Sequence, residues 1–301
     1  MHEIYPIVVF CFNRPVHLQK TLDALKLNYL SSLSDLFIYS DGPKHSNDES
    51  KVQLVRDIIS NIEGFKSVNV INRESNMGLA ASVISGVNEV LDKYDACIVL
   101  EDDLETSPYF LTYLNEALNY YKGNTNIFSV SGFCPPIHIP KEYKYESFLF
   151  PRINSWGWGT WKDRWVKVDW EVKGFHEFIY DKGLRSKLAE QGADLPIMLL
   201  KQQQGKIGSW AVRFNQACFN SGATNIYPVC SLVRNLGADG TGTHMRSSDK
   251  FFVKLCRNSL SSLNLSYSEI INIRFRRFYN PSLYRRFINY IKILLYIRRL
   301  L

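Results

Sequence analysis

Three consecutive acids, Glu101, Asp102 and Asp103, directly follow a short apolar run at 97–100. Such a run predicts a buried strand, so the acids are expected at its carboxyl end, where open α/β sheets bind ligands. Neighbouring carboxylates repel one another, and a cation relieves that repulsion. Oxygen ligands suit Mg²⁺ or Mn²⁺, and either ion can bridge to a diphosphate. The alternative is an acidic loop that caps the next helix, which Ser107-Pro108 also indicates.

The elements that must position these acids alternate between strand and helix patterns. Strands are expected at 4–12, 36–39, 68–71, 96–100 and 127–130, and helices at 15–27, 50–62, 79–91 and 109–121. This alternation predicts an α/β fold with a mostly parallel central sheet flanked by helices. The first strand is not followed by a glycine-rich dinucleotide motif, and the sequence has no P-loop motif, so both of those sites are disfavoured.

The second half of the sequence has a different texture. Prolines at 135, 136 and 140 mark the break, and a tryptophan-glycine cluster follows at 156–161. Helices are expected at 175–191 and 195–204, and a strand at 225–229. We interpret 1–134 and 135–250 as two halves of one catalytic domain, with 251–301 as a C-terminal extension.

The net charge of +7 is located in the tail. Residues 274–301 hold eight bases and no acid, and the rest of the chain has 28 bases against 29 acids. After Pro281, apolar residues recur every three or four positions, which predicts a basic amphipathic helix. Such a helix fits the surface of an anionic membrane, here through residues 273–301, and nucleic acid is not expected as a partner. The alternative is a helix packed on the body of the protein or on a partner chain.

Cysteine usage and the amino end indicate the compartment. The six cysteines are scattered without a C-x-x-C pair, which favours reduced thiols. No signal peptide and no membrane-spanning apolar run is evident. We therefore expect a cytoplasmic protein that associates peripherally with the inner face of the cell membrane.

Four blocks in order give the chain a resemblance to a known family. They are VVFCFNRP at 8–15, SDG at 40–42, NMGLA at 76–80 and EDDLE at 101–105. With them the chain resembles the GT-A glycosyltransferases, and among these the bacterial family-2-like sugar transferases and the N-acetylglucosaminyltransferase I group. Residues 157–159 and 232–244 look like the acceptor-side blocks of that family. The resemblance covers roughly residues 4–245.

The resemblance implies a fold and an activity. The fold would be of GT-A type, Rossmann-like, with a nucleotide-sugar donor-binding half and an aromatic-rich acceptor-side half. The activity would be metal-dependent transfer of a hexosyl or N-acetylhexosaminyl group, with inversion, from a UDP-linked donor. A glycan or a lipid-linked molecule would be the acceptor, in the assembly of a surface polysaccharide.

The resemblance also assigns residues of the donor site. Asp103 would bind Mn²⁺ or Mg²⁺, and Asp41 would accept a hydrogen bond from the uracil N3–H. The donor-binding set is Arg14, Asp41, Asn76, Gly78, Glu101 and Asp102. The structural alternatives are a simple turn at Asp41 and a solvated charge at Arg14.

The catalytic base is less evident, because relatives carry an acid in the block that corresponds to 209–213 and this chain has none there. Asp239 is our first choice for the base and His244 the second, followed by Asp163 and Asp194.

Acceptor or donor-sugar contacts are expected from the aromatic half. Trp156 or Trp158 could stack on a sugar ring, although tryptophans more often pack in a core. Gly157 and Gly159 would let the backbone approach a ligand closely.

Two other functions compete with sugar transfer. One is a catalytically inactive glycosyltransferase-like binding or scaffold module, favoured by the missing acid near Trp210. The other is a nucleotidyltransferase, which needs a triphosphate-binding loop rich in glycine and basic residues near its amino end. Asn13-Arg14-Pro15 follows the first strand instead, which argues against it.

Overall fold

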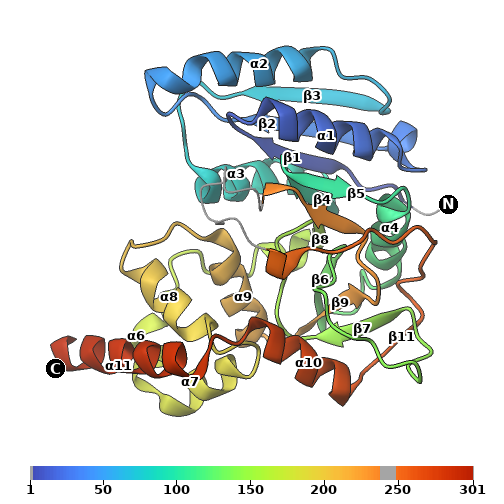
Figure 1. The fold of residues 1–301 in the computed structure, drawn as a ribbon. Coiled ribbons are helices and arrows are strands. Elements are labelled where there is room, and N and C mark those ends of the chain that lie inside the picture. Colours follow the sequence, from blue (N-terminus) through green and yellow to red (C-terminus); the bar gives the residue numbers. More distant parts are fainter. Residues whose placement is uncertain (1–2, 238–248, 301) are drawn as a thin grey trace.

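The computed structural model describes residues 3–237 and 249–300. In this part of the chain, one nine-stranded sheet has the order β11-β7-β9-β6-β8-β4-β1-β2-β3 (Figure 1). Its strands are β1 (Ile7–Cys11), β2 (Asp35–Ser40), β3 (Ser67–Asn72), β4 (Ala96–Glu101), β6 (Ile127–Ser131), β7 (Ser147–Phe150), β8 (Trp158–Trp161), β9 (Thr224–Pro228) and β11 (Leu265–Ser266). A separate pair joins β5 (Leu104–Thr106) to β10 (Val233–Asn235).

Helices cover both faces of the sheet (Figure 1). They are α1 (Pro15–Lys26), α2 (Glu49–Ser60), α3 (Leu79–Leu91), α4 (Phe110–Tyr120), α5 (Lys162–Trp165), α6 (Phe175–Tyr180), α7 (Lys182–Ala189), α8 (Leu195–Gln203), α9 (Trp210–Asn220), α10 (Glu269–Tyr279) and α11 (Leu283–Leu300). Short 3₁₀ turns lie at Ser31–Leu33, Ser46–Asp48 and Asp249–Phe251.

The first half of the chain forms the parallel part of the sheet, in which β3, β2, β1 and β4 are neighbours. Successive residues of β1 alternate between two cores: Ile7 and Val9 pack in the core with α1, α2 and α4, and Val8 and Phe10 in the core with α3 and α9. Burial on both faces explains why these strands are continuous apolar runs in the sequence. The predicted α/β fold with its mostly parallel sheet is confirmed, and the predicted strands and helices up to residue 131 lie within a few residues of the observed ones.

The tryptophan-glycine cluster becomes the central strand β8, which pairs antiparallel with both β4 and β6. Gly159 is tightly packed, because a Cβ there would lie 3.1 Å from Leu118 of α4 and 3.2 Å from the Cys97 carbonyl. Gly157 has a positive φ of 59°, and its Cβ would lie 2.6 Å from Val233. The two glycines therefore permit close packing inside the protein, and the expectation that they admit a ligand is wrong.

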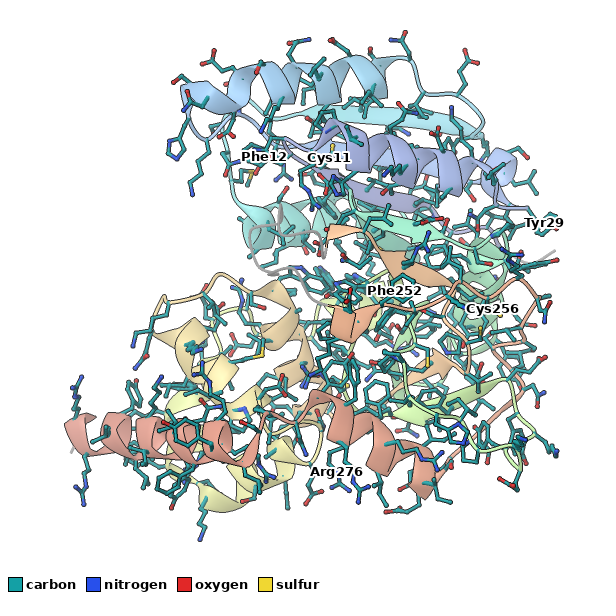
Figure 2. The ribbon with its side chains drawn as sticks, in the orientation of Figure 1. Cys11, Phe12, Tyr29, Phe252, Cys256 and Arg276 are labelled. Atoms are coloured by element: carbon teal, nitrogen blue, oxygen red, sulfur yellow. The ribbon has the colours of Figure 1, made fainter. Side chains whose placement is uncertain are left out.

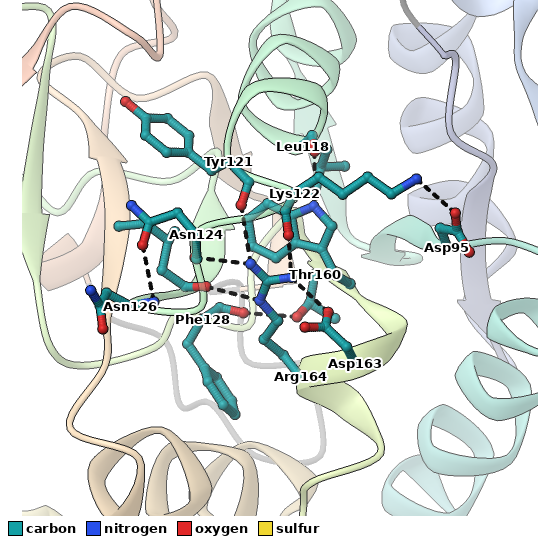
Figure 3. A network of polar contacts seen from close by, with 12 residues as sticks. Asp95, Leu118, Tyr121, Lys122, Asn124, Asn126, Phe128, Thr160, Asp163 and Arg164 are labelled. Atoms are coloured by element: carbon teal, nitrogen blue, oxygen red, sulfur yellow. Dashed lines mark hydrogen bonds and ion pairs between the residues drawn. The ribbon is translucent and has the colours of Figure 1, made fainter.

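A buried arginine fixes the corner after β8 (Figure 3). Arg164 is 1% exposed and donates hydrogen bonds to the carbonyls of Tyr121, Lys122 and Asn124 at 2.8 to 3.0 Å. It also pairs with Asp163 at 2.6 Å. Two of these carbonyls also accept backbone hydrogen bonds, Tyr121 O from Asn124 N and Asn124 O from Ile127 N. Arg164 therefore reinforces the turn after α4 and joins it to α5.

The helical region after residue 170 differs from the prediction in two respects, because α9 was not predicted and one expected helix is divided. The single helix expected at 175–191 is divided into α6 and α7 at Asp181, whose backbone is extended. The Asp181 side chain accepts a hydrogen bond from Leu184 N and so caps α7. Ser209 caps α9 in the same way.

The last helix, α11, lies against α8 and α6 through Ile293, which is 6% exposed (Figure 1). Its opposite side exposes several large apolar residues, namely Leu283, Tyr284, Phe287, Tyr290, Leu294 and Leu295. The predicted amphipathic helix is present. Within 3–237 and 249–300, none of the helices combines the length and apolar character that crossing a bilayer requires.

Candidate active site

Three parallel strands end side by side at one edge of the sheet. Cys11 pairs with Ser40, and Phe10 pairs with Glu101, so the residues that follow β1, β2 and β4 emerge together. Figure 2 shows Cys11 and Phe12 at this edge. A cleft of about 1120 Å³ opens there. Its lining includes predicted site residues from both halves of the chain: Arg14, Asp41, Asn76, Gly78, Glu101, Asp102, Asp103 and Trp156.

The acidic triplet is held by α1 and by the loop before it. Arg14 Nη1 lies 2.7 Å from Asp103 Oδ2 and 3.7 Å from Asp102 Oδ1. Phe12 N donates to Asp102 Oδ2 at 3.3 Å, and Thr21 Oγ1 donates to the Asp102 carbonyl at 2.8 Å. Among the described residues, Arg14 Nε and Nη2 are buried without a hydrogen-bond partner. The arginine therefore neutralises part of the triplet and keeps two unused donors beside it.

Burial and mutual repulsion destabilise the charged form of these acids. Burial, and next the charge of Asp103, raise the pKa of Asp102 to about 7, while Arg14 lowers it. The pKa of Glu101 is raised for the same reasons, with burial the largest cause and Asp103 the next. Negative charge at this site is thus only partly compensated by Arg14, and an added cation would stabilise it.

A divalent cation at this site would need oxygen ligands from a substrate in addition to those of the protein. The described residues contain no group of three or more His, Cys, Asp or Glu side chains arranged to hold a metal. Mg²⁺ commonly binds through one or two carboxylates together with substrate phosphates. Asp103 and its neighbours match that ligand type, since all of them are hard oxygen donors.

Asp41 organises the start of α3. Its carboxylate accepts hydrogen bonds from Met77 N at 2.9 and 3.1 Å and from Gly78 N at 3.1 Å. Asn76 Nδ2 donates to the Gly42 carbonyl at 3.1 Å. Gly78 has a φ of 75°, a conformation that favours glycine. The blocks at 40–42 and 76–80 therefore form one hydrogen-bonded unit at the cleft, and the Asp41 carboxylate joins the two blocks.

Two tryptophans of the second half have different positions. Trp156 lines the cleft, with its ring edge-on to Phe133 at 4.6 Å and to Phe251 at 5.3 Å. Trp158 is 1% exposed and stacks between Trp210 at 4.8 Å and Trp165 at 5.8 Å. The expectation that Trp158 contacts a sugar is therefore corrected: its ring belongs to the core between β8 and α9.

The residues predicted as bases lie either outside the described residues or away from the lining of the cleft. Asp239 and His244 lie outside the described residues, although Gly237, just before them, lines the cleft. Asp163 pairs with Arg164 (Figure 3), and Asp194 makes two hydrogen bonds with Arg152 at 2.8 and 2.9 Å. Neither Asp163 nor Asp194 is among the described residues that line the cleft.

The structure adds cleft residues that the sequence did not single out for the site. Trp170, Glu171 and Arg213 lie on the wall formed by the second half. Asn235 of β10 also lines the cleft and donates to Asp103 Oδ1 at 3.4 Å. Asn235 belongs to a block that resembled the acceptor side, whereas nothing in the local sequence distinguishes Glu171 from a surface acid.

Residues 7–168 match the family described as glycosyl transferase family 2. No curated protein matches the chain. Among solved structures, TarS of S. aureus is similar at 10% identity and a TM-score of 0.39, over 56% of this chain and 30% of TarS. The mannosyltransferase PcManGT from Pyrobaculum calidifontis, in complex with GDP-Man and Mn²⁺, is similar at 8% identity and a TM-score of 0.39, over 72% of this chain and 68% of the other. Mouse xyloside xylosyltransferase 1 has 10% identity and a TM-score of 0.38, over 72% and 81%.

Proposed function

Because this chain belongs to glycosyl transferase family 2, and so is a glycosyltransferase, we propose that it transfers a sugar from a UDP-linked donor to a glycan or lipid-linked acceptor with the help of a divalent cation. One observation carries this proposal. The acidic triplet after β4, Asp41 after β2 and the first turn of α3 all line the same large cleft. This edge of a parallel sheet is where nucleotides bind in open α/β folds.

Asp103 is the proposed ligand of Mn²⁺ or Mg²⁺, with Asp102 beside it holding the ribose or the donor sugar. When bound, the cation would neutralise charge on the diphosphate leaving group. Arg14 contributes from the protein side, because its two unused donor nitrogens, Nε and Nη2, can donate to a phosphate oxygen or a uracil carbonyl. Asp41 has lone pairs beyond those used by Met77 and Gly78, and one of them accepts the uracil N3–H.

The assignment of Asp103 is tested by calorimetric titration of Asp103→Ala with UDP and a panel of UDP-sugars, with and without Mn²⁺. We expect metal-dependent binding to disappear while the unfolding temperature stays close to that of the wild type. Asp163→Ala, an acid outside the cleft, is the comparison variant and should bind as the wild type does. Unchanged affinity in Asp103→Ala would remove this residue from the metal site.

An inactive binding module remains the second candidate, because Arg213 stands in the block where relatives carry an acid. Release of UDP from a UDP-sugar in the presence of Mn²⁺ separates the two: an enzyme turns the donor over, and a binding module only holds it. Family membership decides against the nucleotidyltransferase alternative.

We further propose that α11 holds the enzyme at the inner face of the cell membrane, beside a lipid-linked acceptor used in surface polysaccharide assembly. Ile293 anchors one side of α11 to the body, while Leu283, Tyr284 and Phe287 are 79%, 76% and 61% exposed. Five exposed bases lie on the same helix, namely Arg285, Arg286, Lys292, Arg298 and Arg299. Each base near an anionic surface contributes about 1 kcal/mol, so the charge and the apolar side act together.

A further inference from the structure

The two walls of the cleft carry different numbers of carboxylates. Among the described lining residues, Asp41 and the acids at 101–103 belong to the donor wall. Glu171 is the carboxylate that the described part of the opposite wall contributes. It is exposed, and within that part of the chain its carboxylate has no hydrogen-bond partner. A ligand that enters from solvent can therefore reach it.

The backbone at Glu171 is held by hydrogen bonds, whereas its carboxylate has no hydrogen-bond partner among residues 3–237 and 249–300. The Asp169 carboxylate accepts hydrogen bonds from Glu171 N at 3.1 Å and from Lys173 N at 2.6 Å. Gln203 Nε2 donates to the Glu171 carbonyl at 3.3 Å. The next residue, Val172, has a φ of 52°, which is rare for a β-branched residue and costs on the order of 1–3 kcal/mol. The surrounding bonds thus hold Glu171 at the cleft in a strained turn.

Arg213 stands in the block where an acid was expected, and it lines the same wall of the cleft as Glu171. Its guanidinium donates to the Trp170 carbonyl at 3.0 Å and to the Ser209 carbonyl at 3.1 Å. Burial lowers the pKa of Arg213, and the charge of Glu171 opposes that effect, so the two side chains interact electrostatically. Glu171 therefore places a carboxylate on the same wall of the cleft as Arg213.

We propose that Glu171 is the general base of the transfer reaction, an assignment that rests on the proposed function. The acceptor hydroxyl oxygen forms a bond to the sugar C1, and the bond from C1 to the diphosphate oxygen breaks with its electron pair leaving on UDP. The hydroxyl proton passes to the Glu171 carboxylate. Water in place of the acceptor requires the same proton removal, so donor hydrolysis reports on the same residue.

The test compares Glu171→Gln with the wild type and with Glu190→Gln, a matched exposed acid at the C-terminal cap of α7. Binding of UDP-sugar with Mn²⁺ is measured by calorimetry, and UDP release by a coupled assay, with water and with a panel of alkyl glycosides as acceptors. We expect Glu171→Gln to bind the donor as the wild type does and to lose about 10²- to 10⁴-fold in kcat, the usual contribution of a general base. In Glu171→Ala, added formate should restore part of the rate.

Three outcomes would overturn the assignment in distinguishable ways. Glu171→Gln with kcat within about threefold of the wild type would exclude Glu171 as the base and favour Asp239 or His244. Loss of donor binding together with rate would make Glu171 a donor-binding residue instead. A wild-type protein that binds no UDP-sugar would overturn the proposed function itself, and the role of Glu171 with it.

Discussion

Asp102→Asn should make the protein more stable in alkaline solution, because the native fold holds an ionised Asp102 at a cost. Its pKa is raised from 3.8 to about 7. A difference of about 3 pKa units corresponds to about 4 kcal/mol, an upper limit for the destabilisation above pH 7. Between about pH 4 and pH 7 the native state binds a proton that the unfolded state has lost. The free energy of unfolding therefore falls by up to about 1.4 kcal/mol per pH unit as the pH rises.

Urea denaturation in EDTA at pH 5, 6, 7 and 8 measures this effect. Asp102→Asn should already be the more stable protein at pH 5, by up to about 1–2 kcal/mol, and the difference should widen to about pH 7 and then level off. Asp57→Asn, an exposed acid on α2, should run parallel to the wild type. Curves for Asp102→Asn and the wild type that stay parallel over the whole range would refute the claim that burial and repulsion raise the Asp102 pKa. Mn²⁺ added at pH 8 should stabilise the wild type more than the variant, because it offsets charge that the variant lacks.

Three further predictions concern other parts of the molecule. Asp41→Ala should reduce the preference for UDP over CDP and ADP in competition binding. It should also lower the free energy of unfolding by about 1–3 kcal/mol, because Met77 N and Gly78 N lose their acceptor. No UDP preference in the wild type would refute the uracil assignment. Trp158→Ala should lower the free energy of unfolding by about 3–5 kcal/mol in urea denaturation. Trp156→Ala should lower it less and should raise the KM for the donor or acceptor. Equal losses of stability would contradict the different positions of the two rings. The double variant Phe287→Ser, Leu294→Ser should no longer co-sediment with anionic vesicles at low salt, while Ile293 keeps α11 on the body. A wild-type protein that does not bind such vesicles but self-associates would make this side of α11 a protein interface.

The sequence predicted the parallel half of the fold well, for a physical reason. Strands buried on both faces leave continuous apolar runs, and β4 is such a run, interrupted only by the acids that reach the cleft. The position of the triplet at the sheet edge follows from that local pattern alone. Asp41 and Asn76 were also placed at the cleft, although their hydrogen bonds to backbone groups are visible only in the fold.

The second half was harder to predict because its structure depends on tertiary contacts rather than on local sequence patterns. The local sequence of a tryptophan between two glycines does not distinguish stacking on a sugar from stacking on Trp210. The expected sugar contact of Trp158 was wrong for that reason. Glu171 lies at the cleft because of a strained turn at Val172, and no residue type in the local sequence predicts that turn. Strand β8 is short, rich in glycine and tryptophan and buried throughout, so neither alternation nor a β-branched run marks it as a strand.

The pairing of β5 with β10 also has a consequence for the order of events during synthesis. Leu104 of the segment after the acidic triplet pairs with Asn235, and Asp103 receives hydrogen bonds from Asn235 and Leu236. At about 5–20 residues per second, a ribosome needs about 7 to 27 s to travel from Asp103 to Gly237. Strand β8, which lies between β4 and β6 in the sheet, is also synthesised in that interval. A nascent chain that ends at residue 134 therefore carries the acidic triplet and its partner Arg14 but still lacks Asn235, Leu236 and the opposite wall of the cleft.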